Sequence, residues 1–195
     1  MLQIICACFR KKPLTKYVES YKGAGCLFTN GTHVLAGYQP NKKVPIISGI
    51  GGTRLPSETN PLDTAIRETI EELFDIKSVD ADTIRDIKSE IYVKKTFVNG
   101  SYHVFVYSFI DLECMLYIMR LNGVSTPIYR TLPKTLSDLI FRRNADNSSE
   151  IRELCILPLE CTRLCKSFVN DLKQLRSNGN NSPRPMYESQ EVCNK

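Results

Sequence analysis

No stretch of this 195-residue sequence approaches the roughly 18 to 20 consecutive apolar residues that a membrane-spanning helix needs. The apolar segment at residues 2–9 is short, and its basic residues follow it, whereas those of a secretory signal peptide come first. The sequence has no internal repeat, and its 42% apolar and 24% charged residues exclude a fully disordered chain and a fibrous rod. We therefore expect an intracellular, cytoplasmic protein with no membrane contact.

Histidine is scarce, and no cysteine pair has the spacing of a zinc site. Cys6 and Cys8 are too close together, Cys161 and Cys165 stand alone, and neither of the two histidines lies near such a pair. The eight cysteines are scattered over a chain that is too long for a disulfide-stapled miniprotein. We expect reduced thiols.

Acidic residues are rare in the first 57 positions, which hold eight bases and Glu19 as the single acid. Residues 58–75, in contrast, contain six acids and one base, Arg67, although the whole chain has a net charge of +5. A dense acidic segment in a basic background suggests a cation site that meets a polyanionic substrate. Basic residues can also serve solubility alone, and charge does not separate the two interpretations.

Apolar periodicity and turn signals predict a domain of mixed strands and helices. The expected elements are a hairpin at 23–39 turned by Asn30-Gly31, a strand at 44–47, a glycine-rich turn at 49–52, a helix at 62–74, a hairpin at 91–110 turned by Asn99-Gly100, helices at 113–122 and 133–143, a strand at 151–157 and a closing helix at 159–175. Strands and helices without regular alternation indicate an α+β fold. We expect a basic arm at 1–20, the domain at 21–176 and a disordered tail at 177–195.

The helix predicted at 62–74 has two different faces. Its apolar residues recur with helical spacing and form one core-facing stripe, made of Leu62, Ala65, Ile66, Thr69, Ile70 and Leu73. The other face carries Glu68, Glu71, Glu72 and Asp75, with no lysine nearby. A solvated face is the commonest explanation of such charges, but like charges at this spacing each cost a few tenths of a kcal/mol. The cluster therefore favours a divalent cation, Mg²⁺ or Mn²⁺, next to the exposed backbone of Gly51-Gly52.

The segment from Gly52 to Glu72 resembles the Nudix box, G-x5-E-x7-R-E-U-x-E-E-x-G-U, in which U is a bulky aliphatic residue. The box spans about residues 51–76, and its matching residues are Gly52, Glu58, Arg67, Glu68, Glu71 and Glu72. Residues 150–159 resemble the late Nudix strand that ends in a Pro-Leu turn. The resemblance implies a Nudix-type α/β/α sandwich with a mixed central sheet.

The sequence departs from the box at three positions. The spacing from Glu58 to Arg67 is one residue too long, and we place the extra residue at Asn60, in the loop before the helix. Thr69 replaces an aliphatic residue, so its hydroxyl needs a partner. Phe74 replaces the glycine that ends the box helix, so we expect another cap, such as Asp75 or a longer last turn.

The resemblance implies that Glu68, Glu71 and Glu72 bind one or more Mg²⁺ or Mn²⁺ ions. Glu58 and a backbone carbonyl at Gly51 or Gly52 would assist. Arg67 would hold the glutamates by charge-assisted hydrogen bonds and would form the catalytic set with Glu68 and Glu71.

The general base differs among Nudix enzymes, so several candidates stay open. A box glutamate, Glu68 or Glu71, is one choice, and the acids of later segments are the others: Glu113, Glu150 and Glu153. Lys42, Lys43 and Arg54 flank the glycines and are candidate phosphate contacts, although surface lysines on a loop are a simpler explanation.

Nudix enzymes cleave a nucleoside diphosphate linked to another moiety X. The resemblance implies a Mg²⁺-dependent pyrophosphohydrolase whose substrate is a nucleoside triphosphate, a dinucleoside polyphosphate, a nucleotide sugar or a capped RNA 5′ end. The basic background and the basic arm are compatible with capped RNA, although a longer RNA-binding extension would strengthen that case. Two alternatives stay open: a non-catalytic Nudix-fold nucleotide-binding or regulatory module, and a structural domain whose acidic helix is merely solvated.

Overall fold

The computed structural model describes residues 21–177, so the expected basic arm, almost all of the expected tail and three cysteines (Cys6, Cys8 and Cys193) lie outside the described residues. The elements are β1 (Gly23–Thr29), β2 (His33–Gln39), β3 (Ile46–Ser48), β4 (Ile50–Thr53), α1 (Pro61–Phe74), α2 (Ala81–Glu90), β5 (Lys95–Asn99), β6 (Tyr102–Ser108), α3 (Phe109–Leu121), α4 (Leu136–Phe141), β7 (Glu153–Pro158) and α5 (Lys166–Ser177). Within residues 21–177, the helices are too short or too polar to cross a bilayer.

The strands form one mixed sheet that is divided into two parts. β1 pairs in parallel with β6 and antiparallel with β4, and β6 pairs with β5. β2 pairs antiparallel with β3 and β7. The two parts meet where Thr29 pairs with Val34, beside the Asn30-Gly31 turn. The first predicted hairpin is therefore correct at its turn, but its strands diverge to different neighbours.

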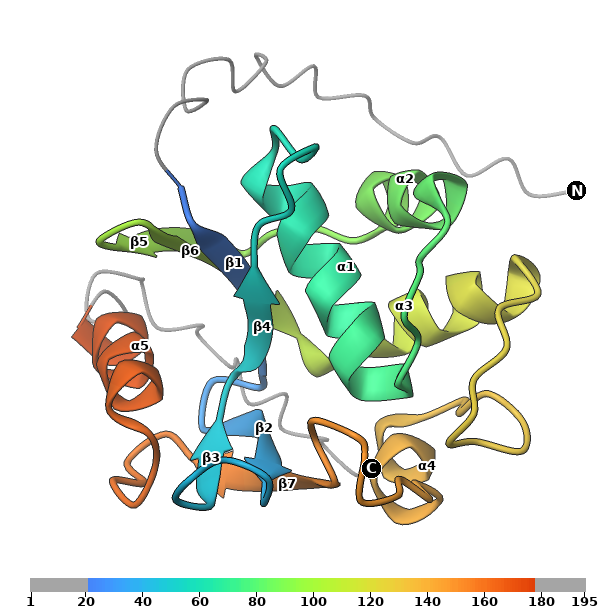
Figure 1. The fold of residues 1–195 in the computed structure, drawn as a ribbon. Helices are drawn as coiled ribbons and strands as arrows, with labels where there is room; N and C mark the ends of the chain where they lie inside the picture. Colours follow the sequence, from blue (N-terminus) through green and yellow to red (C-terminus); the bar gives the residue numbers. More distant parts are fainter. Residues whose placement is uncertain (1–20, 178–195) are drawn as a thin grey trace, which may run out of the picture.

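Helices cover both faces of the sheet (Figure 1). Successive side chains of a strand point to opposite faces. On β1, Ala24 and Phe28 therefore pack in the core beneath α1, whereas Leu27 packs against Phe168 and Leu172 of α5 on the other face. The predicted α+β fold with a mixed central sheet between helical layers is confirmed.

Three local predictions differ from the structure. Residues 50–53 form strand β4 rather than a turn, because their glycines pair with β1. Helix α2 was not predicted, since Thr83 and Ile87 are its only buried residues and leave a weak apolar pattern. The closing helix begins at Lys166 rather than 159, because the strand before it continues to Pro158 and a turn follows.

Candidate active site

Helix α1 keeps the register of the box despite the extra residue. Asn60 is its N-cap, and its side chain accepts a hydrogen bond from the backbone N–H of Leu62 (2.9 Å), ahead of Pro61 in the first turn. The buried Thr69 hydroxyl donates to the carbonyl of Ala65 (2.7 Å). The helix ends at Asp75, which has a left-handed conformation (φ 54°). Asn60, expected in the loop before the helix, is thus the N-cap, Thr69 has the partner that its hydroxyl was expected to need, and Asp75 is the C-cap, one of the two expected ends.

Arg67 joins three carboxylates of the box. Its guanidinium donates to Glu58 (2.6 Å), Glu71 (2.6 Å) and Glu68 (2.9 Å), and also to the carbonyl of Thr53 (2.9 Å). The arginine is 7% exposed. These short charge-assisted bonds come from a planar donor group, so they fix the directions of the three carboxylates. The structure thus brings together four of the residues that the box singles out.

Glu72 points away from Arg67 and toward β4. One carboxylate oxygen accepts the backbone N–H of Gly51 (2.6 Å), and the other accepts the side-chain amide of Gln39 (3.5 Å). Glu72 is 7% exposed and forms no salt bridge with another described residue. Burial raises the pKa of Glu72 to about 8, the charges of Glu150 and Glu68 add to this, and the bond from Gly51 partly offsets it.

The other box carboxylates differ in their pKa values. Burial opposes ionisation of Glu58, but its bonds from Arg67, the N–H of Leu55 and the hydroxyl of Thr64 outweigh burial and lower its pKa. Burial raises the pKa of Glu68 and of Glu71 despite the charge of Arg67. One guanidinium therefore pairs with three carboxylates while Glu72 lies apart, and the box is left with an excess of negative charge.

This donor set suits a hard divalent cation in its chemistry, because carboxylate oxygens are the ligands that Mg²⁺ and Mn²⁺ prefer. The arrangement is nevertheless not a formed metal centre. In the part of the chain that the structure describes, no group of three or more His, Cys, Asp or Glu side chains is arranged to hold a metal ion. Arg67 holds three of the carboxylates in ion pairs instead.

Two glycines of β4 allow the backbone to approach the carboxylates closely. A Cβ atom at Gly52 would lie 2.3 Å from Oε2 of Glu68. Gly51 has a φ of 144°, and a Cβ there would lie 2.3 Å from the Cα of Gly25 on the neighbouring strand. Gly51 therefore requires glycine for reasons of space and of backbone conformation, whereas a Cβ at Gly52 would displace the carboxylate of Glu68.

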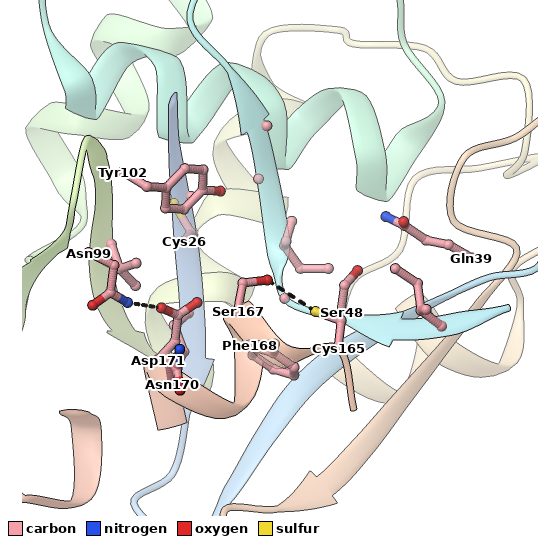
Figure 2. A pocket seen from close by; sticks show the side chains of 18 of the residues that line it. Cys26, Gln39, Ser48, Asn99, Tyr102, Cys165, Ser167, Phe168, Asn170 and Asp171 are labelled. Carbon is pink, nitrogen blue, oxygen red and sulfur yellow. Dashed lines mark hydrogen bonds between the residues drawn. The ribbon is translucent and has the colours of Figure 1, made fainter. Parts of the chain in front are cut away.

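A pocket of about 810 Å³ opens beside β4. Figure 2 shows Gln39 at one end and Asn99 with Asp171 at the other, with Ser48 and Phe168 between them. The lining includes Gly51 and Gly52 of β4, Tyr102 of β6, and Lys42 and Glu150 from two loops. The volume is in the range of small-molecule and cofactor sites. The pocket therefore extends from the box backbone to helix α5.

The loop that carries Glu150 is fixed to the end of α1 by Arg143. The guanidinium of Arg143 donates to the carbonyls of Glu72 (3.0 Å), Leu73 and Ile151 (2.6 Å). These bonds satisfy helix-end carbonyls that lack partners within the helix. Sequence reasoning missed Arg143, because its two partners on α1, Glu72 and Leu73, lie 71 and 70 positions earlier in the chain.

The remaining predicted candidates lie in different places. Lys42 pairs with Glu150 (2.8 Å) at the pocket wall. Arg54 donates to the carbonyl of Glu58 (2.7 Å) and lies over the ring of Tyr21, 4.8 Å from its centroid. Three other candidates do not line the pocket: Glu113 accepts the N–H of Leu136 at the start of α4, Glu153 is exposed on β7, and Lys43 is exposed on a loop.

Asn99 and Asp171 line the pocket, and sequence reasoning did not single them out as site residues. Asn99 was interpreted as a turn residue, and Asp171 as part of the closing helix. The available signal was weak: Ser167, Asn170, Asp171 and Gln174 recur with the spacing of one polar helix face.

No family model and no curated protein matches this sequence. Among solved structures, the chain is similar to a bifunctional NMN adenylyltransferase/ADP-ribose pyrophosphatase from Francisella tularensis, in a complex with AMP and a Mn ion (14% identity, TM-score 0.47). The alignment covers 83% of this chain and 42% of that one, so the chain spans less than half of that enzyme. It is also similar to a UDP-X diphosphatase (13% identity, 86% and 68% covered, TM-score 0.43) and to a NUDIX-family hydrolase from Clostridium perfringens (12% identity, 82% and 98% covered, TM-score 0.36). These are similarities of fold.

Proposed function

We propose that this chain is a metal-dependent Nudix-type pyrophosphohydrolase that cleaves the diphosphate linkage of a nucleoside diphosphate derivative. The observation that carries the proposal is the joining of Glu58, Glu68 and Glu71 by Arg67 beside a pocket of about 810 Å³. Carboxylates with shifted pKa values next to a cleft are typical of functional sites, and here the pKa of Glu58 is lowered while those of Glu68 and Glu71 are raised.

Glu68, Glu71 and Glu72 are the residues that would hold Mg²⁺ or Mn²⁺, with Glu58 and the backbone at Gly52 beside them. Glu72 supports this assignment best, because its buried carboxylate forms no salt bridge with another described residue. Bound metal supplies neutralisation of diphosphate charge and a lowered pKa for a water ligand.

The chain's own residues perform the remaining tasks. Arg67 orients the box carboxylates, and the N–H of Gly51 orients Glu72. Arg54 donates a hydrogen bond to the backbone carbonyl of Glu58 and does not line the pocket, so we assign it to positioning. Lys42 is better placed than Lys43 to meet a phosphate, since it lines the pocket.

Glu150 is the general base that we favour among the acids of later segments. It lines the pocket, and its charge raises the pKa of both Glu68 and Glu72, so it lies within electrostatic reach of the box. Proton transfer requires a base within hydrogen-bond reach of the attacking water, directly or through one water. Glu68 and Glu71 are the alternatives within the box.

A non-catalytic nucleotide-binding or regulatory module is the second candidate function. The observation that favours it is the pairing of three box carboxylates with Arg67, without a group arranged for metal in residues 21–177. Such a module would bind nucleotides without turnover. The proposed hydrolase could act on free nucleotides or on a capped RNA 5′ end, and the test below includes both.

The test is product release from nucleoside triphosphates, dinucleoside polyphosphates, nucleotide sugars and capped RNA, with and without Mg²⁺. We expect turnover that requires the metal and falls about 100-fold or more in Glu72→Gln. Glu160→Gln, at an exposed position outside the pocket, is the matched control and should keep full activity. Nucleotide binding without turnover on any substrate would support the binding module instead.

A further inference from the structure

We infer that the end of the pocket farthest from Gln39 binds a guanine base. The carboxylate of Asp171, oriented by Asn99, would accept hydrogen bonds from the two neighbouring N–H groups of the base edge. This inference rests on the proposed function and specifies the nucleotide portion of its substrate. The recognition would place the base against α5 and the phosphates toward β4.

Helix α5 presents a fixed polar face to the pocket. Phe168 and Leu172 are buried in the core on the far side of the sheet from α1, which sets the rotation of the helix. Asp171 consequently lies on the face that meets the β5–β6 hairpin. Lys95 of β5 donates to the carbonyls of Gln174 and Leu175 (3.3 and 3.2 Å) and so holds the helix end against the sheet.

A chain of side-chain hydrogen bonds orients Asp171. The amide N–H of Gln174 donates to the Asn99 carbonyl oxygen, and the Asn99 amide N–H donates to one oxygen of Asp171 (Figure 2). Both hydrogen bonds are donated in the direction of Asp171, so its carboxylate is the last acceptor of the chain. Its second oxygen has no hydrogen-bond partner within residues 21–177 and can accept donors from a ligand.

The charge of Asp171 is only weakly compensated. It forms no salt bridge with a described lysine or arginine, and burial raises its pKa to about 6, although the bond from Asn99 partly offsets this. At neutral pH it is therefore ionised, half-buried and short of donors. A half-buried carboxylate of this kind gains most from a ligand that supplies N–H groups.

Guanine fits this acceptor better than the other bases do. Its N1–H and N2–H donors are adjacent, so both can meet one carboxylate, whereas adenine and cytosine each place a ring-nitrogen acceptor beside their amino group. Uracil has one N–H between two carbonyl oxygens, which a carboxylate repels. The negative charge of Asp171 also disfavours phosphate at this end and leaves the Lys42 end for it.

The test measures binding of GMP, IMP and AMP to the full chain by calorimetry in Mg²⁺, so that it needs no turnover. IMP keeps N1–H but lacks the N2 amine. We expect GMP to bind more tightly than IMP and IMP more tightly than AMP. The dissociation constants of AMP and GMP should differ by about 10- to 100-fold. Asp171→Asn should reduce this range to about threefold or less. Asp82→Asn, on the exposed face of α2, should leave it unchanged.

Equal affinity for GMP and AMP in the wild-type protein overturns the inference, and so does a preference for GMP that survives in Asp171→Asn. Absence of binding by all three nucleotides overturns it as well. The nucleotide series in the wild-type protein remains decisive if Asp171→Asn fails to fold. Turnover of substrates without a preference for the base contradicts the guanine site but not the proposed hydrolase. Binding of GMP that depends on Asp171, without turnover of any guanine derivative, contradicts the proposed hydrolase.

Discussion

Arg67→Met removes the guanidinium that joins the box carboxylates and keeps an apolar stem of similar length. In the wild-type structure, Arg67 donates to Glu58, Glu68 and Glu71 and is 7% exposed. The variant leaves these carboxylates without their cation in a partly dehydrated site. We expect it to be clearly destabilised at pH 7 in the presence of a chelator.

The size of the effect follows from burial. Removing one partner of a buried ion pair costs about 3 to 5 kcal/mol. The side chains of Glu58 and Glu68 are 13% and 14% exposed, but that of Glu71 is 25% exposed, so water compensates for part of the loss. We therefore expect a loss of about 3 kcal/mol in the free energy of unfolding, or a fall of roughly 6 to 12 °C in Tm.

The effect of pH has a defined sign. Without Arg67, burial and mutual repulsion raise the pKa values of the three carboxyl groups above their unfolded values. Groups of this kind favour the folded state below the unfolded pKa, and that contribution is lost as pH rises through the folded pKa. The deficit of Arg67→Met should thus shrink between pH 7 and pH 5.

Urea unfolding of both proteins at pH 5 and pH 7 measures this. Arg85→Met is the matched control, because Arg85 is 69% exposed and its pair with Asp82 lies at the surface, so we expect a change within about 0.5 kcal/mol. A loss below about 1 kcal/mol in Arg67→Met, with no dependence on pH, would refute the reasoning that Arg67 balances the box charges.

Three further predictions concern other residues of the site. Gly52→Ala would place a methyl group 2.3 Å from Oε2 of Glu68 and should lower kcat about 10-fold or more, measured beside thermal unfolding to separate activity from stability. In chelator, the stability of the wild-type protein should fall as pH rises from about 4.5 to 8, because burial raises the pKa of Glu72 to about 8. Glu72→Gln should make this slope shallower, most clearly above about pH 6, and should remove the stabilisation by Mg²⁺ in thermal unfolding. Asp171→Asn should likewise remove a decline in stability between about pH 4 and pH 6 in urea titrations, since the pKa of Asp171 is raised to about 6.

The sequence was most informative where its signals were local. Helix α1 has its apolar stripe and its acidic residues within 15 positions, so its extent could be predicted to within one residue, and Asp75 was one of two expected ends, but the N-cap role of Asn60 was not predicted. The insertion before the helix could also be placed, because a loop absorbs one residue without changing the register of the faces that follow.

The missed features depend on contacts between distant segments. The glycines of β4 were assigned to a turn from their type, but Gly51 is needed because Gly25 of another strand lies against it. Asn99 and Asp171 are 72 positions apart and meet only when α5 packs on the sheet. No local pattern encodes such a meeting, because the packing of Phe168 decides the rotation of the helix.

The hydrogen bonds of Arg143 join segments that are synthesised at different times. The carbonyls of Glu72 and Leu73 receive its bonds from 71 and 70 positions later, and Asp75 receives the hydroxyl of Ser149 from 74 positions later. A nascent chain that has not yet reached residue 143 already carries every box residue but lacks the loop that forms the opposite wall. Since domains are made from the N-terminus onward, the surroundings of the candidate site are completed late, after residues 143–151 have left the ribosome. A fragment released before that point would carry the acidic helix without the bonds at its end, and the pocket would lack Glu150 and the wall formed by α5.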